Sequence, residues 1–334
     1  MVSILRGKNV LVTGGTGSIG EAIVQKALAD GARTVKIFSN DENGLYEMEV
    51  SFHENKKLEF IIGDIRDENT VNSAVKGTDI VFHTAALKHV DRCEVHPMEA
   101  IAVNIIGTNN IAKASLREKV KKVISISTDK AVNPIGVMGG TKLLAEKLIS
   151  AEAFRHNSTI FSSVRFGNVL HTRGSILPRI ERQIKKGGPI TLTDKRMKRF
   201  FMTKEDAVNL IMAATQIAKG GEIFVLKMPV IRLIDLFEMM KQVLAPKYGF
   251  HPSQIKTKII GIRPGEKLLE DLLNDFEMER ALETKDFFII PPHFEVRRTS
   301  DYPDAKKPKD IRKYLGNIKP LEKEQILKML KQIY

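Results

Sequence analysis

Residues 8–20 read KNVLVTGGTGSIG, a short apolar run that leads into a glycine-rich loop and then into a helical pattern. Gly15, Gly17 and Gly20 fit the spacing G-x-G-x-x-G, and Gly14, Gly17 and Gly20 fit T-G-x-x-G-x-x-G. Glycines in such a loop let the backbone approach a pyrophosphate, to which the helix N-terminus offers N–H donors. The stretch therefore predicts a strand, a phosphate-binding turn and a helix, which together open a dinucleotide-binding fold.

Strand and helix patterns alternate through the first half of the chain. Apolar runs predict strands at residues 8–13, 34–38, 58–62, 79–83, 122–127 and 160–165. Helical patterns lie between them at residues 19–29, 71–75, 98–115 and 139–153. Strands that read as continuous apolar runs are typical of a parallel sheet covered on both faces. We predict an α/β fold with a Rossmann-like doubly wound parallel sheet.

The regular alternation of strand and helix patterns becomes less clear after Gly167. A length of 334 residues suggests about two domains at roughly 150 residues each. We predict a dinucleotide-binding domain at residues 1–166, to which residues 200–226 return. The other segments, 167–199 and 227–334, are expected to form a smaller, mixed α/β substrate-binding part.

Composition and charge narrow the class of protein. Apolar residues make up 43% of the chain, which is typical of an ordinary globular protein. The single cysteine, Cys93, excludes an intrachain disulfide, and no spacing of His, Cys, Asp or Glu indicates a metal site. No apolar stretch of membrane-spanning length and no signal-peptide pattern are present, so we expect a cytoplasmic protein without a membrane partner. The net charge of +13 is diffuse and Trp is absent, which argues against nucleic acid and favours attraction of an anionic small molecule such as a nucleotide.

Residues after the second strand bear on the choice between NAD and NADP. An acidic residue at that strand end would bind the ribose 2′-hydroxyl and repel a 2′-phosphate. Ser39 and Asn40 are neutral and Asp41 comes later, which favours NADP and leaves NAD open. The full set of expected cofactor contacts is Gly14, Thr16, Gly17, Ser18, Ile19, Ser39, Asn40, Asp41, Asp64, Ile65, Ala85, Ala86, Lys88 and Lys142.

The fifth strand ends in Ser127, Thr128, Asp129 and Lys130, which places an acid and a base where ligands bind in such sheets. Met138 and Lys142 follow, and their four-residue spacing puts them on one helix face.

These features resemble the extended short-chain dehydrogenases/reductases. More narrowly, they resemble the UDP-N-acetylglucosamine 4,6-dehydratases of surface-sugar biosynthesis. The resemblance extends from about residue 7 to about residue 292. It is carried by the glycine loop and by residues 83–90 (HTAALKHV), 103–108 (VNIIGT), 127–134 (STDKAVNP), 165–169 (RFGNV), 172–175 (TRGS), 199–200 and 260–267 (IGIRPGEK).

The resemblance implies an internal redox dehydration, in which oxidised cofactor takes the sugar C4 hydride and later returns it to C6. It makes Lys130 the base at C5, Asp129 the acid at the 6-hydroxyl, and Thr128 a hydrogen-bond donor to O4. We expect burial and nearby positive charge to lower the pKa of Lys130 and burial to raise that of Asp129. Lys142 is expected to hold the nicotinamide ribose.

Two residues depart from the family pattern. Met138 stands where most relatives carry a tyrosine, as in a methionine subgroup of the family, and it cannot transfer protons. The base for the 4-hydroxyl is therefore open between Asp129 and Lys142. Asn40 stands where relatives often carry an arginine for the 2′-phosphate, which weakens the case for NADP.

The resemblance also implies a UDP-sugar partner. Arginine suits a pyrophosphate because its planar fork binds phosphate oxygens in pairs, and a glutamate can accept from ribose hydroxyls. The expected substrate contacts are Lys88, Asn168, Arg173, Thr193, Arg199, Arg263 and Glu266.

We therefore expect 4,6-dehydration of UDP-N-acetylglucosamine, with inversion at C5, by a homo-oligomer. A nucleotide-sugar 4-epimerase is one alternative, although it would need neither an acid at O6 nor a base at C5. Met138 motivates another, a dinucleotide-binding regulator without activity.

Overall fold

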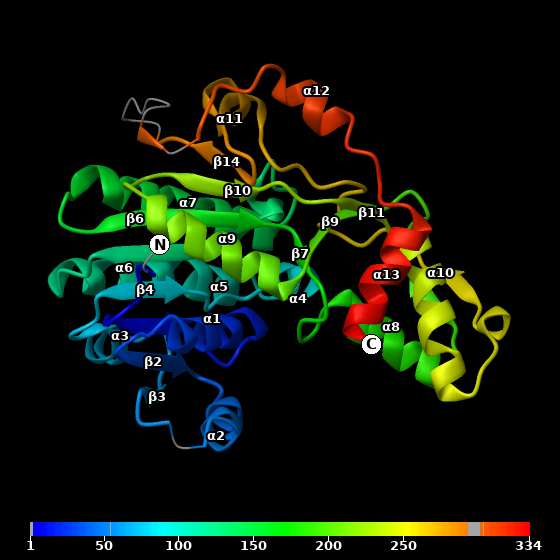
Figure 1. Ribbon diagram of the computed structural model, residues 1–334, viewed down its shortest axis with the longest axis horizontal. Coiled ribbons are helices and arrows are strands. Elements are labelled where there is room, and N and C mark those ends of the chain that lie inside the picture. The colour runs from blue at the N-terminus through cyan, green and yellow to red at the C-terminus, as the bar shows by residue number, and fades with distance from the viewer. Residues whose placement is uncertain (1–2, 54, 293–300, 303) are drawn as a thin grey trace.

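The computed structural model describes residues 3–53, 55–292, 301–302 and 304–334. Within them, nine strands form one sheet in the order β13-β14-β10-β6-β5-β4-β1-β2-β3 (Figure 1). The strands are β1 (Asn9–Thr13), β2 (Thr34–Ser39), β3 (Leu58–Ile62), β4 (Ile80–His83), β5 (Lys122–Thr128), β6 (Ile160–Phe166), β10 (Ile223–Leu226), β13 (Leu282–Glu283) and β14 (Phe287–Ile290). From β3 to β10 all neighbours pair in parallel. The predicted doubly wound parallel sheet is confirmed.

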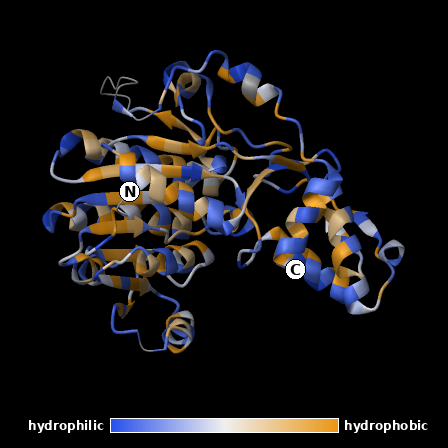
Figure 2. Cartoon of the chain, in the orientation of Figure 1, coloured by the Kyte–Doolittle hydropathy of each residue, from blue (hydrophilic) through white to orange (hydrophobic). Residues whose placement is uncertain are grey.

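Helices cover both faces of the sheet. They are α1 (Ser18–Ala29), α2 (Glu42–Ser51), α3 (Glu68–Val75), α6 (Thr108–Arg117), α7 (Val137–Arg155) and α9 (Lys204–Ile217). Two short helices, α4 (Val90–Val95) and α5 (Pro97–Ile101), pack against α7. In β1, Val10 and Val12 join the core under α1 and α9, whereas Leu11 joins the core under α3, α6 and α7. This alternation follows from the two-residue period of a strand and leaves the central strands apolar on both faces. Figure 2 shows these strands coloured largely as hydrophobic.

The predicted helix at residues 98–115 is interrupted by a π-helical turn, η1 (Ala102–Gly107). The turn contains the buried Asn104, whose side chain accepts from Leu87 N at 2.8 Å and donates to Leu87 O at 3.1 Å. Such turns recur at functional sites, and this one fixes the segment that follows β4.

A second, smaller unit carries its own apolar core. It contains β7 (Asn168–Val169), α8 (Ile176–Lys185), β8 (Ile190–Leu192), β9 (Lys198–Met202), β11 (Val230–Arg232), α10 (Leu233–Leu244), η3 (Pro246–Tyr248), η4 (Pro252–Gln254), β12 (Thr257–Ile259) and α13 (Lys323–Ile333). Leu177, Phe237 and Leu330 bring α8, α10 and α13 together in that core. Figure 1 places this unit beside the carboxyl ends of the strands, where it can cover a ligand.

The sheet corrects the predicted domain boundaries in two places. β13 and β14 lie within residues 227–334 but extend the large sheet, because β14 pairs antiparallel with β10 through four buried apolar residues. β9 begins at Lys198 and pairs with β7 and β11 in a separate three-stranded sheet, so residues 200–202 do not return to the large one. Residues 227–334 also contain α11 (Asp275–Arg280), which precedes β13, and α12 (Ile311–Gly316), which follows β14. Residues 1–2, 54, 293–300 and 303 of the predicted ranges lie outside the described residues.

Across the described ranges, no helix combines the length and the apolar character needed to cross a membrane.

Candidate functional site

A cavity of about 530 Å³ opens at the carboxyl ends of the strands, where the order reverses between β1 and β4. Ligands of open α/β sheets bind at this kind of position. The structure brings all fourteen expected cofactor residues to its wall, together with Thr128, Lys130, Met138 and Asn168.

The glycine loop is shaped for close approach of a ligand. Gly14 has φ +63°, and a Cβ there would lie 2.8 Å from the backbone of Ala85. Helix α1 begins directly after Gly17, which has no side chain to cap its first N–H groups. These donors therefore face the cavity without competition from a cap, as a bound pyrophosphate requires. A dinucleotide fits this cradle.

Lys142 is buried beside Met138 at the floor of the cavity. Its Nζ donates to Ile126 O at 2.6 Å. Burial lowers the pKa of Lys142 to about 8, and the nearby Glu146 opposes this shift. Lys142 is therefore partly neutral near physiological pH.

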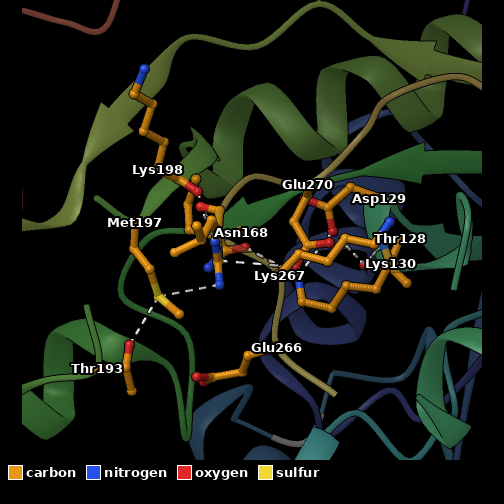
Figure 3. A network of polar contacts seen from close by, with 12 residues as sticks. Thr128, Asp129, Lys130, Asn168, Thr193, Met197, Lys198, Glu266, Lys267 and Glu270 are labelled. Carbon is orange, nitrogen blue, oxygen red and sulfur yellow. Dashed lines mark hydrogen bonds and ion pairs between the residues drawn. The ribbon is translucent and has the colours of Figure 1, made fainter. Parts of the chain in front are cut away.

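Asp129 and Lys130 form a close ion pair on the short 3-10 turn η2 (Asp129–Ala131), which follows β5. Lys130 Nζ lies 2.9 Å from Asp129 Oδ1 and 3.5 Å from Asn168 Oδ1. Thr128 Oγ1 donates to Asp129 Oδ1 at 3.0 Å. The other carboxylate oxygen of Asp129 is buried without a hydrogen-bond partner among the described residues. Figure 3 shows these side chains pointing toward one another.

The expectation that the pKa of Lys130 is lowered is wrong. Burial disfavours the ammonium, but the carboxylates of Asp129 and Glu270 outweigh burial and raise the pKa of Lys130. Burial and neighbouring positive charge alone would lower this pKa, but nothing in the sequence indicated that Glu270 lies beside Lys130.

Glu270 is a functional candidate that the sequence did not reveal. Its side chain is 4% exposed, and Oε1 lies 3.7 Å from Lys130 Nζ and 4.0 Å from Arg199 Nε. Burial and the charge of Asp129 raise the pKa of Glu270 above its usual range, against the opposing effect of Lys130 and Arg199. The residue stands three positions after the stretch 260–267, and only the fold brings it to Asp129.

A second cavity of about 240 Å³ adjoins the first, and Lys88, Lys130 and Asn168 line both. Four further expected substrate residues surround it, namely Thr193, Arg199, Arg263 and Glu266. Arg179 on α8 also lines this cavity, and its Nε is buried without a partner among the described residues. Sequence reasoning missed Arg179 because a helical arginine in a basic segment resembles ordinary surface charge.

The side chains of this second cavity are partly held by the protein. The buried Arg199 donates to the carbonyls of Lys198 at 2.8 Å and Leu268 at 3.1 Å. Thr193 Oγ1 donates to the sulfur of Met197, and Glu266 accepts from the backbone N–H of Arg263 at 3.3 Å.

Arg173 departs from its expected place among the substrate residues. Its side chain donates to the carbonyl of Thr16 in the glycine loop, and its backbone N–H donates to Ser18 Oγ at 3.0 Å. Its guanidinium also lies 3.9 Å from the carboxylate of Asp41. Arg173 therefore lies on the cofactor side of the site, and Lys88 Nζ holds its carbonyl at 2.7 Å.

Among the described residues, no group of three His, Cys, Asp or Glu side chains is placed to hold a metal ion. Asp64 lines the first cavity, but Arg66 holds its carboxylate at 2.7 Å and lowers its pKa, which leaves less of it for a ligand.

Comparison with known proteins agrees with this geometry. Residues 10–292 match the family model described as polysaccharide biosynthesis protein. A Methanocaldococcus jannaschii relative, named only as an uncharacterized membrane protein, is 48% identical over 98% of this chain and 96% of its own length. A protein of Rickettsia canadensis named UDP-glucose 4-epimerase is 39% identical over 85% of this chain and 83% of its own length.

A solved structure, Pen from Bacillus thuringiensis, is 40% identical over 98% of each chain and superposes with a TM-score of 0.90. The family model covers most of this chain, and these relatives cover nearly all of the rest. The chain therefore belongs to the polysaccharide biosynthesis protein family.

Proposed function

We propose that the protein is an NADP-dependent 4,6-dehydratase of UDP-N-acetylglucosamine that inverts C5. The observation that carries this proposal is the position of the Asp129–Lys130 pair. Lys130 borders both cavities, so its amine faces the junction between a dinucleotide site and an arginine-lined site. Asp129 itself lines neither cavity, but it lies 2.9 Å from Lys130, so an acid and a base meet directly beside a sugar held at this junction.

The first cavity supports the cofactor assignment. The glycine loop and the start of α1 would hold the pyrophosphate, and Lys142 would hold the nicotinamide ribose. Oxidised nicotinamide, when bound, accepts a hydride from C4 of the sugar and gives it back at C6. Arg173 lies beside Asp41, which offsets the negative charge that a 2′-phosphate would meet at the end of β2.

The second cavity supports the substrate assignment. Arg179, Arg199 and Arg263 line it, and guanidinium groups bind diphosphate oxygens in pairs. Glu266 is available for uridine ribose hydroxyls, and Thr193 for the sugar or the nucleotide. A UDP-sugar seated there would present its sugar to Lys130.

The pair would perform the elimination as follows. Lys130 takes the C5 proton, which the 4-ketone makes acidic, and Asp129 protonates the leaving 6-hydroxyl. Thr128 is placed to hydrogen-bond O4, since its hydroxyl lies beside Asp129. Lys142 favours the O4 alkoxide electrostatically through its partial positive charge.

The test is incubation of the purified protein with UDP-N-acetylglucosamine in heavy water, followed by NMR and mass spectrometry. The proposal expects a product lighter by one water, with deuterium at C5 and couplings at C5 that report the inverted configuration. A product with the substrate's mass and inverted C4 would instead establish an epimerase.

The 4-epimerase is the second candidate, and the name of the Rickettsia relative favours it. It would use the same two cavities and the hydride chemistry at C4 alone. Under that function, Lys130→Ala would retain turnover, because epimerisation needs no base at C5. Under dehydration, the same variant would lose it.

A further inference from the structure

The proposed 4,6-dehydration needs an acceptor for the O4 proton, and Asp129 and Lys130 by themselves do not provide one. Oxidation at C4 releases the O4 proton, and departure of the 6-hydroxyl as water consumes a proton. Met138 cannot accept the first proton. In addition, Lys130 is paired with Asp129 and has a raised pKa, so it begins as an ammonium and not as a base.

Glu270 completes a row of three titratable groups at this point. Lys130 Nζ lies between two carboxylates, 2.9 Å from Asp129 Oδ1 and 3.7 Å from Glu270 Oε1. Asp129 and Lys130 come from the turn after β5, whereas Glu270 comes from a loop between β12 and α11. Figure 3 shows Glu270 directed at this pair, while Glu266 points elsewhere.

The surroundings suit transfer of a proton along the row. Asp129 is fully buried and Glu270 nearly so, and a buried carboxyl group takes up a proton more readily than one in water. Glu270 also lines the second cavity, so a sugar seated there can reach it. The charged groups that face Glu270 are Lys130 and Asp129 from the turn, Arg199 from β9 and Lys267 from its own loop.

Two other buried bases, Lys142 and His83, do not line the second cavity, where the sugar would sit. Lys142 Nζ is directed at the carbonyl of Ile126 and lines only the cofactor cavity of the two. His83 is fully buried between the hydroxyls of Thr13 and Thr108 and does not line either cavity. Glu270 is the carboxylate that lines the sugar side and contacts Lys130.

We propose that Glu270, Lys130 and Asp129 form a proton relay that carries the proton lost from O4 to the departing 6-hydroxyl. The relay rests on the proposed dehydratase function and supplies the proton acceptor that Met138 cannot provide. Glu270, which lines the second cavity, is its receiving end. Asp129, which is buried beside Lys130 and lines neither cavity, is its delivering end.

The protons balance over one turnover. The O4–H bond breaks and its proton goes to the carboxylate of Glu270. Lys130 passes one ammonium proton to Asp129, which makes a neutral amine and a carboxylic acid. The amine then takes the C5 proton while the acid protonates O6 as the C6–O6 bond breaks. The C5 proton is later returned or exchanged with water, and Glu270 finally reprotonates Lys130, which restores all three groups.

The first test uses Glu270→Gln, which keeps the size of the side chain and removes its proton affinity. Holoenzyme is mixed rapidly with UDP-N-acetylglucosamine, and oxidation at C4 is followed by absorbance at 340 nm. We expect this rate to fall by about 100-fold or more, while the Kd for UDP stays within about threefold of wild type. An unchanged rate in Glu270→Gln would overturn the relay.

Asp271→Asn is the matched control, because Asp271 is the next residue, is half-exposed and pairs with Lys267. It should keep the wild-type rate. Glu270→Asp retains a carboxylate and should recover part of the rate lost in Glu270→Gln. Equal Tm values would show that none of the three variants acts through folding. An equal loss of rate in all three would speak against the relay.

The second test needs no substrate turnover. The pKa of Lys130 is measured by isotope-labelled reductive methylation and NMR in wild type and in Glu270→Gln. Removing an anion that contacts Lys130 should lower this pKa measurably. An unchanged value would mean that the two groups are not coupled, which excludes the relay. If UDP-N-acetylglucosamine is not converted by wild type, the proposed substrate fails, whereas this titration still decides whether Glu270 and Lys130 are coupled as the relay requires.

Discussion

Arg165 and Glu146 form a two-point ion pair in the interior of the protein. Nη2 of Arg165 lies 2.7 Å from Glu146 Oε2 and Nε lies 3.1 Å from Oε1, although neither side chain is accessible to solvent. Glu277 binds the same guanidinium at 2.9 and 3.0 Å. One arginine thus joins β6, α7 and α11. Helix α11 begins five residues after Glu270, so this arginine also anchors the chain next to the loop that carries Glu270.

Arg165→Met should therefore be strongly destabilising. It leaves two carboxylates buried without a counter-charge, a loss of about 3–5 kcal/mol in the free energy of unfolding. Urea denaturation at pH 7 measures it. The triple variant with Glu146→Leu and Glu277→Leu removes the uncompensated charges and should recover most of the loss. Wild-type stability in Arg165→Met would show that the ion pairs contribute nothing.

The low pKa of Lys142 predicts a pH-dependent cost of its burial. The folded pKa of about 8 lies below the ordinary value of 10.5, so the penalty is fully present below pH 8 and disappears as pH rises toward 10.5. Lys142→Met should therefore gain stability relative to wild type at pH 7 by roughly 2.5 kcal/mol more than at pH 10. Urea denaturation at both pH values tests this, with exposed Lys258→Met as the control that shows no such difference.

Features encoded by neighbouring residues could be predicted from the sequence, whereas features that depend on contacts between distant residues could not. The first six strands and the glycine loop were predictable because each is encoded by neighbouring residues, as in residues 8–20. The membership of β14 in the large sheet was not, since its four apolar residues could pair with any exposed strand edge. Glu270 and Arg173 were missed or misplaced because their roles depend on contacts with residues more than 130 positions away, at Lys130 and Thr16.

Gly14→Ala should abolish tight cofactor binding. The new methyl group would overlap the backbone of Ala85 at 2.8 Å, and φ of +63° is unfavourable for alanine. We expect cofactor affinity by calorimetry to fall more than about tenfold and stability to fall by about 1–3 kcal/mol. Gly140→Ala is the control, because it lies in helix α7 with open space around its Cβ position and should be neutral or slightly stabilising. Unchanged cofactor affinity in Gly14→Ala would remove this loop from the binding site.

Arg173 and Arg263 should separate the two ligand sites. Arg173 contacts Thr16 and lies near Asp41, whereas Arg263 lines the second cavity. Loss of a charged hydrogen bond costs about 1.5–3 kcal/mol, or roughly 10- to 100-fold in affinity. Arg173→Ala should lose that much affinity for NADP and little for UDP, and Arg263→Ala should show the reverse. Measuring NAD in parallel decides what Arg173 recognises, because a loss confined to NADP identifies the 2′-phosphate and an equal loss identifies the shared pyrophosphate. If Arg173→Ala weakened UDP alone, the contacts to the glycine loop would be incidental and Arg173 would belong to the substrate.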